Sequence, residues 1–159
     1  MDLSNVSPIY RHNLIVPASS LDENGHVNNL EYLRWLLDAA ALHAWNRGVT
    51  EAMKAAGAAW VVRRHRIEYF HPAFAGEHLL ILTWVSTVRR VQSLRKYKIF
   101  RREDNNLLVA AETDWVFLDF QSGKLRSIPQ DVRIAFPVLP EEQEAAALKK
   151  CIVEQKQAN

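Results

Sequence analysis

The spacing of apolar residues predicts one long helix near the start of the chain. This helix spans residues 29–47, and its apolar positions recur at three- and four-residue intervals to form one stripe: Leu30, Leu33, Leu37, Ala40, Ala41 and Ala44. Asn28 is a candidate N-cap with Glu31 three residues later, as in a capping box, and Gly48 marks the end of the helix. A shorter helical stretch is expected from Thr50 to Ala56.

Strand-like segments lie on both sides of this helical region. A first strand is expected between Ile9 and Pro17. Four later segments are rich in β-branched and aromatic residues: Trp60–Tyr69, His78–Val88, Ser93–Arg101 and Leu107–Phe120. No helical pattern alternates with these segments, which argues against a doubly wound parallel sheet. We therefore predict an α+β domain in which a five-stranded antiparallel sheet wraps around the long helix.

The chain becomes more polar toward its C-terminal end. A short extended segment, Lys124–Ile128, leads to Pro129, which is expected to open a helical turn. Beyond Pro140, Glu, Gln, Lys and Ala dominate, so we expect either a surface helix or a loose tail. The interpretation is a single domain over residues 1–139 followed by a polar C-terminal tail over residues 140–159.

Composition narrows the functional class. The 159 residues are 48% hydrophobic and 24% charged, as expected of one globular domain. Because 20 basic and 18 acidic residues leave a net charge of +2, no nucleic acid or membrane partner is expected. The single cysteine, Cys151, cannot form an internal disulfide and offers no thiolate metal site. No apolar run approaches the ~18 residues of a membrane span. We expect a cytoplasmic protein without metal or redox cofactor.

A polar loop directly ahead of the long helix carries the candidate chemistry. Asp22, Asn24, His26 and Asn29 supply groups that hydrogen bond or transfer protons. The first N–H groups of a helix have no partner inside it, so the N–H of Asn29 can stabilise an oxyanion on a substrate carbonyl. A carboxylate on the preceding loop, here Asp22, can act as general base toward water or as nucleophile toward carbon.

This loop resembles the active-site loop of hotdog-fold thioesterases. Residues 21–29 read Leu-Asp-Glu-Asn-Gly-His-Val-Asn-Asn and are followed by Tyr32 and Trp35. Bacterial 4-hydroxybenzoyl-CoA-type thioesterases share the Asp, the Gly, the Val and the Tyr at these spacings. The resemblance implies a hotdog fold and hydrolysis of acyl-CoA, with Asp22 catalytic and the helix start at Asn29 polarising the thioester.

Plant acyl-carrier-protein (ACP) thioesterases resemble the loop even more closely. Their Asp-x-Asn-x-His-Val-Asn-Asn motif is reproduced from Asp22 to Asn29, which adds Asn24 and His26 to the implied catalytic network and makes acyl-ACP an alternative substrate. Glu68 and Glu77 are candidates for a further acidic residue of that network. The plant enzymes contain two hotdog units, whereas this chain has the length of one. The resemblance therefore implies a homodimer, or a dimer of dimers forming a homotetramer.

Basic residues provide a candidate site for the phosphates of CoA. Arg89 and Arg90 fall at a bend where the benzoyl-type relatives use basic residues, and Arg126 has a similar place later in the chain. Arginine suits this role because its planar fork grips phosphate oxygens in pairs. The resemblance implies substrate binding by these three residues.

Some of these residues also fit other structural or functional interpretations. Asp22 and Asn24 also fit simple turn formers. A calcium loop is excluded because Val27 and Leu33 occupy positions that require Gly and Glu. The basic run at residues 63–66 fits a solvated or subunit-interface strand better than a nucleic-acid site. A non-catalytic hotdog protein that binds acyl thioesters remains the alternative from a different functional class.

Overall fold

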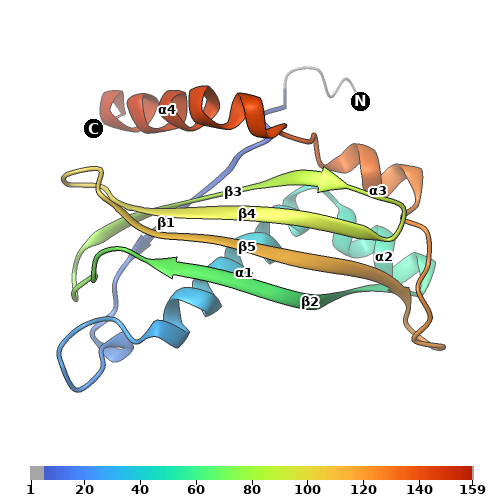
Figure 1. Cartoon of the computed structure of the whole chain (residues 1–159), viewed down its shortest axis with the longest axis horizontal. Coiled ribbons are helices and arrows are strands. Elements are labelled where there is room, and N and C mark those ends of the chain that lie inside the picture. Colours follow the sequence, from blue (N-terminus) through green and yellow to red (C-terminus); the bar gives the residue numbers. More distant parts are fainter. Residues whose placement is uncertain (1–5, 159) are drawn as a thin grey trace.

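The computed structural model describes residues 6–158 and confirms the α+β architecture (Figure 1). One antiparallel sheet has the strand order β1-β3-β4-β5-β2. Its members are β1 (Tyr10–Ile15), β2 (Ala58–Tyr69), β3 (His78–Val88), β4 (Gln92–Arg101) and β5 (Leu107–Asp119). All five expected strands are present. The longest helix, α1 (Asn29–Asn46), lies against one face of this sheet, as the sequence predicts.

The buried face of α1 differs from the stripe predicted from sequence. The residues that pack on the sheet are Tyr32, Trp35, Leu36, Ala39, Ala40 and His43. They meet Leu79 and Ile81 of β3 and Tyr97 and Ile99 of β4. Leu30, by contrast, is 72% exposed, and Ala41 is exposed as well. The helix therefore has two apolar faces, and the aromatic face occupies the sheet because it buries more area.

The opposite face of the sheet is covered by α4 (Glu141–Gln157). Leu80, Leu82 and Trp84 of β3 point away from α1 and pack against Leu148 and Cys151 of α4. The segment beyond Pro140 is thus a helix docked on the sheet, which settles the choice between a helix and a loose tail. This double cover explains why β3 is buried almost without interruption.

Polar contacts fix α4 in place. The Glu144 carboxylate accepts a hydrogen bond from Trp84 Nε1 at 3.1 Å and forms an ion pair with Lys96 at 3.0 Å. Both partners lie on the outer face of the sheet, and both ionic side chains are largely buried. Glu144 therefore anchors the first turns of α4 over β3 and β4.

Shorter helices close one end of the sheet. α2 (Val49–Ala56) leads into β2, and α3 (Gln130–Ala135) begins directly after Pro129, as predicted. Their apolar residues form a separate cluster with the sheet that includes Val49, Val85, Phe117, Ile128, Val132 and Phe136. A single 3₁₀ turn, η1 (Ala18–Ser20), follows β1 at the opposite end. None of the helices within residues 6–158 is long and apolar enough to cross a membrane.

Strand β2 forms an open edge of the sheet. It is 12 residues long and pairs only with β5, so its outer edge presents unpaired backbone groups. Val61 on this strand is 44% exposed. Arg64 and Arg66 of the basic run pair with Asp114 at 2.7 Å and Glu68 at 3.3 Å. Together with the second apolar face of α1, this edge is where we expect a second copy of the chain to pack.

The docking of α4 can be tested by truncating one buried side chain. Leu148 is 5% exposed, so Leu148→Ala is expected to lower the free energy of unfolding by about 2–5 kcal/mol. Val153→Ala on the same helix is the matched control, because Val153 is 46% exposed and its truncation should change the stability by no more than about 0.5 kcal/mol. Denaturant titration of both variants measures the difference. Equal stabilities would contradict the docked position of α4.

Candidate active site

The loop that precedes α1 is organised by the side chain of Asp22. Its Oδ1 atom accepts hydrogen bonds from the backbone N–H groups of Asn24 at 2.9 Å and His26 at 3.2 Å. The Asp22 N–H in turn donates to the His26 carbonyl at 2.7 Å. Gly25 completes the turn at a φ of +76°, a conformation that glycine adopts without strain. Asp22 is therefore a turn former, as one interpretation of the sequence expected.

The second carboxylate oxygen of Asp22 is free for other chemistry. Within residues 6–158, Oδ2 makes no hydrogen bond, and Asp22 is exposed at the surface of the single chain. The two backbone donors hold Oδ1, which fixes the direction of Oδ2. The structural and chemical interpretations of Asp22 are thus compatible.

The rest of the loop places the start of α1. Val27 is buried, and its N–H donates to the Ala73 carbonyl at 3.0 Å. The N–H of Asn28 donates to the Ser20 carbonyl at 2.9 Å. These two bonds lock the loop between η1 and the segment that follows β2.

Asn28 caps the helix as predicted. Its side-chain Oδ1 accepts from the Leu30 N–H at 2.9 Å, whereas the predicted capping-box partner, Glu31, lies 3.9 Å from Arg34 in an ion pair. The N–H of Asn29 has no acceptor among the described residues. The Asp22 carboxylate and this free helix-terminal N–H thus belong to the same short segment, and such an N–H stabilises developing negative charge on oxygen.

Asn24 and His26 lie in the same loop but do not bond to the Asp22 carboxylate through their side chains. The His26 ring packs edge-on against Phe74, with centroids 5.2 Å apart. The two candidate acids are also occupied: Glu77 pairs with Arg101 at 3.0 Å, and Glu68 pairs with Arg66. Asp22 is therefore the candidate carboxylate within the loop itself, and its second oxygen is uncommitted.

The three candidate phosphate-binding arginines lie at the other end of the sheet. Arg90 Nη1 donates to the Ser127 hydroxyl at 3.2 Å, which brings the bend after β3 next to the segment that holds Arg126. The Arg126 side chain donates to the Ala56 carbonyl and lies 3.9 Å from Asp119, so it is committed to the fold. Arg89 and Arg90 are exposed. Within one chain, the structure does not bring these residues to Asp22.

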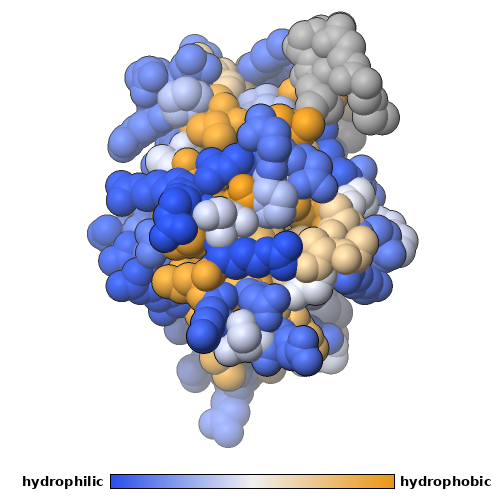
Figure 2. Space-filling view, turned by 90° about the vertical axis from the view of Figure 1, so that its right-hand side faces the viewer, coloured by the Kyte–Doolittle hydropathy of each residue, from blue (hydrophilic) through white to orange (hydrophobic). Residues whose placement is uncertain are grey.

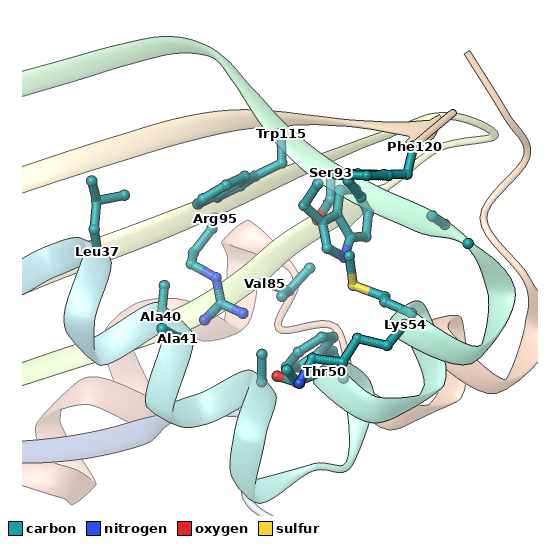
Figure 3. A pocket seen from close by; sticks show the side chains of 17 residues that line it. Leu37, Ala40, Ala41, Thr50, Lys54, Val85, Ser93, Arg95, Trp115 and Phe120 are labelled. Carbon is teal, nitrogen blue, oxygen red and sulfur yellow. The ribbon is translucent and has the colours of Figure 1, made fainter. Parts of the chain in front are cut away.

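A pocket of about 580 Å³ opens at the arginine end, and sequence reasoning did not find it. It lies between the second half of α1, the helix α2 and the inner face of the sheet (Figure 3). Its walls are mostly apolar and include Leu37, Ala41, Met53, Trp60, Phe120 and Phe136. Figure 2 shows this end of the molecule, where hydrophilic side chains surround hydrophobic patches. The volume suits a ligand of drug-like size.

Arg95 is the one buried charge that lines this pocket. It is 5% exposed, and its Nη1 donates to Thr83 Oγ1 and to His43 Nδ1, both at 3.1 Å. Burial lowers the pKa of Arg95, but a guanidinium remains a cation in proteins. The guanidinium also lies 5.1 Å from the centre of the Phe136 ring.

His43 is held in its neutral form by this arrangement. Burial, and then the charges of Arg95 and Arg47, lower the pKa of His43 to about 3. Because Arg95 donates to Nδ1, the imidazole proton resides on Nε2, which has no hydrogen-bond partner within residues 6–158. The ring is packed between Tyr10 and Phe136. His43 therefore serves as an acceptor that fixes the Arg95 guanidinium.

Comparison with known proteins identifies the family. The family model described as the thioesterase-like superfamily matches residues 16–136, more than half of the chain. The chain belongs to the thioesterase-like superfamily. This membership supports thioester hydrolysis as the class of reaction. A comparison with curated proteins found no match.

Solved structures share the fold. The 1,4-dihydroxy-2-naphthoyl-CoA thioesterase Slr0204 from Synechocystis is 21% identical at a TM-score of 0.74, with 80% of this chain and 95% of that chain covered. An acyl-ACP thioesterase from Bacteroides thetaiotaomicron is 20% identical at 0.74, covering 84% of this chain and 56% of that one. SAV2348 from Staphylococcus aureus, solved in complex with CoA, is 13% identical at 0.74, covering 89% and 84%. The hotdog-type thioesterase fold is thereby confirmed.

No group of three or more His, Cys, Asp or Glu side chains arranged to hold a metal ion occurs in the described part of the chain.

The depressed pKa of His43 predicts a specific loss of stability in acid. The unfolded chain binds a proton at the ordinary pKa of 6.5, whereas the folded chain keeps His43 neutral down to about 3. The contribution is complete above pH 6.5 and is lost as the pH falls toward 3. Between pH 6.5 and 4.5 the loss should be about 2–3 kcal/mol.

Chemical denaturation at several pH values measures this slope in wild type, in His43→Gln and in His71→Gln. In the His43 variant, the slope of the free energy of unfolding against pH should be smaller by the amount expected for the uptake of about one proton. The His71 variant, altered at an exposed histidine, should retain the wild-type slope. Parallel curves for wild type and His43→Gln would show that His43 is not buried in its neutral form.

Proposed function

We propose that this protein hydrolyses acyl-CoA thioesters to the free acid and CoA, using Asp22 and the N–H of Asn29. The observation that carries the proposal is the free Oδ2 of Asp22 in the loop that leads into a helix-terminal N–H without an acceptor among the described residues, in a chain of the thioesterase-like superfamily. Asp22 forms the turn through Oδ1 alone, so Oδ2 remains available, and the Asn29 N–H is available because the first N–H groups of a helix have no partner inside it.

The reaction follows from these two groups. The thioester carbonyl oxygen accepts the Asn29 N–H, which stabilises the oxyanion formed when carbon is attacked. Asp22 takes the proton of an attacking water, or attacks the carbon itself to give an anhydride that water then opens. The C–S bond breaks, and the CoA thiolate leaves and takes up a proton. Asn24 and His26 hold the loop and complete the polar surface around Asp22.

A second subunit completes the site in this proposal. Pairing two β2 edges antiparallel about a twofold axis brings the Tyr69 end of one strand beside the Ala58 end of the other. Tyr69 donates to the Asn29 carbonyl at 3.2 Å, so it marks the catalytic end, whereas Ala58 lines the pocket. Figure 1 shows that these ends lie on opposite sides of one chain. Asp22 of one protomer thus faces the pocket of its partner.

The bound carrier is CoA in this proposal, because Arg89 and Arg90 are exposed at the pocket end and available to phosphate oxygens. The similar structures include a 1,4-dihydroxy-2-naphthoyl-CoA thioesterase and an acyl-ACP thioesterase, so both carriers occur among proteins of this fold. Acyl-ACP is therefore the second candidate. Hydrolysis of the same acyl chain presented on CoA and on ACP separates the two, and a protein that binds both without turnover would be a scaffolding member of the fold.

Asp22→Asn is expected to reduce kcat by about 10²–10⁴ while leaving ligand binding largely intact. The amide keeps the size of the side chain, and its oxygen can still accept from Asn24 and His26, but it can neither take a proton nor attack carbon. Release of free thiol from acyl-CoA measures turnover.

Glu23→Gln is the matched control, since it makes the same change at the adjacent exposed residue and should leave kcat near the wild-type value. A kcat for Asp22→Asn above about one tenth of wild type would reduce Asp22 to its turn-forming role. His26→Ala, measured beside it, would then test the next candidate base.

The two-subunit site predicts complementation between inactive variants. One partner carries Asp22→Asn, and the other carries Ala44→Phe, which fills the pocket. A mixed dimer then has one complete site, so random exchange of subunits should restore about one quarter of wild-type activity. If each chain supplied both parts of its own site, no mixed dimer would be active. Circular dichroism of each parent protein confirms that it is folded before mixing.

A further inference from the structure

The pocket contains a positive charge that the proposed hydrolysis does not use. Arg95 lies on β4 with its guanidinium directed toward Ala40 and Ala41 of α1 (Figure 3). Within residues 6–158, no carboxylate forms an ion pair with it. The side chain is therefore a cation, almost fully enclosed, without a counter-charge.

Such a charge is costly to bury. A guanidinium removed from water loses its hydration, and only a good partner or a full set of hydrogen bonds compensates for it. Thr83, His43 and the Phe136 ring compensate in part, through Nη1 and the flat face. The remaining N–H groups, on Nε and Nη2, donate to none of the described residues.

The neighbouring groups hold Arg95 rather than neutralise it. His43 is neutral, and Thr83 is a hydroxyl, so neither supplies a negative charge. Ser93 lies two residues earlier on β4, on the same face of the strand, and lines the same pocket. The hydroxyl of Ser93 and the open edge of Arg95 form a polar patch inside a chamber whose other walls are mostly apolar, with Thr50 and the exposed Lys54 on the α2 side.

The position of this patch matches the far end of an acyl group. In the two-subunit site proposed above, Asp22 of the partner subunit faces this pocket, so an acyl group whose thioester lies at that Asp22 extends into the chamber toward Ser93 and Arg95. CoA phosphates are expected at the exposed Arg89 and Arg90 and not inside this chamber, because its walls are mostly apolar and its buried cation, Arg95, is almost fully enclosed. A compact anionic oxygen carried by the acyl group itself fits the chamber.

We propose that the pocket selects acyl groups that carry an acidic oxygen, a carboxylate or a phenolic hydroxyl, at the end remote from the thioester, and that Arg95 binds this oxygen. The inference rests on the proposed function for the identity of the ligand as an acyl thioester. Arg95 acts on specificity and leaves the chemistry at Asp22 unchanged.

Binding to the Asp22→Asn variant tests the proposal without turnover. The probes are pantetheine thioesters, which present the part common to CoA and ACP. Two matched pairs are compared by calorimetry: octanoyl with its terminal-carboxylate analogue suberoyl, and phenylacetyl with para-hydroxyphenylacetyl. At least one acid-bearing member should bind about ten- to a hundredfold more tightly than its plain partner, as expected for a hydrogen bond to a charged group. A preference in the octanoyl pair indicates that the pocket selects a carboxylate, and a preference in the phenylacetyl pair indicates that it selects a phenolic hydroxyl.

Arg95→Met, placed in the same background, should abolish the preference while leaving the plain ligands within about twofold, because methionine preserves much of the volume of the side chain. Arg95→Lys keeps the charge and should retain part of the preference. Thr50→Val is the matched control, since it alters an uncharged wall of the same pocket and should leave the preference intact.

Equal binding of both members of each pair by the Asp22→Asn protein would overturn the proposal, as would an equal loss for both members in Arg95→Met. If Arg95→Met does not fold, the pairwise preference and the Arg95→Lys variant still decide. A binding preference in a protein that hydrolyses none of the thioesters would leave this inference standing and refute the proposed function. Hydrolysis without any preference would do the reverse.

Discussion

The packing of α1 against the inner face of the sheet is the constraint on which the rest of the molecule depends. Tyr32 and Trp35 bind the first half of the helix to the sheet, and the Tyr32 hydroxyl accepts from the Ala73 N–H at 3.0 Å. This contact fixes the start of the helix relative to the loop of Asp22, because Val27 donates to the Ala73 carbonyl. The loop is thus tied to the core through Ala73, in addition to the bond between Asn28 and the buried Ser20. Its geometry follows from the sheet even though the loop is exposed.

The second half of the same helix meets the sheet differently. Ala40, Ala41 and Ala44 are small, so the helix leaves space over β4 and β5 that becomes the pocket. Large aromatic residues near Asn29 and small residues toward Asn46 thus produce two ends with different roles, one rigid and one hollow. The open edge of β2 runs alongside both, and its antiparallel symmetry allows the rigid end of one chain to meet the hollow end of another.

Periodicity was sufficient to predict the helices and strands, because each has a strong local pattern. It failed where one segment has two apolar faces. On α1, Leu30 and Leu37 fit a stripe as well as Tyr32 and Trp35 do, and the choice between them is made by the sheet. The sequence does contain a signal for the docking of α4. The residues of β3 are apolar at consecutive positions from Leu79 to Leu82, which requires that both faces of the strand be covered.

The candidate site contains features set by residues close together in the sequence and features set by residues far apart, and only the first kind could be predicted. The turn at Asp22 and the cap of Asn28 could be predicted from the sequence, because a turn and a helix start involve residues a few positions apart. The pocket could not, since its walls come from α1, α2 and four strands. Arg95 was hidden for the same reason, although Ser93, Arg95, Tyr97 and Ile99 alternate along β4 and place an arginine on the buried face.

An arginine at such a position is informative because the fold does not need it there. A hydrophobic residue of similar volume would fill the space between α1 and β4 without losing hydration, and such replacements are often neutral or stabilising. His43 adds to this burden, since it is kept neutral beside the charge and leaves Nε2 unpaired. Arg95 and His43 are buried polar side chains that reduce stability, and His43 orients Arg95 toward the pocket. A role in ligand binding explains why both are present. The remaining open N–H groups of Arg95 then define what that chamber selects.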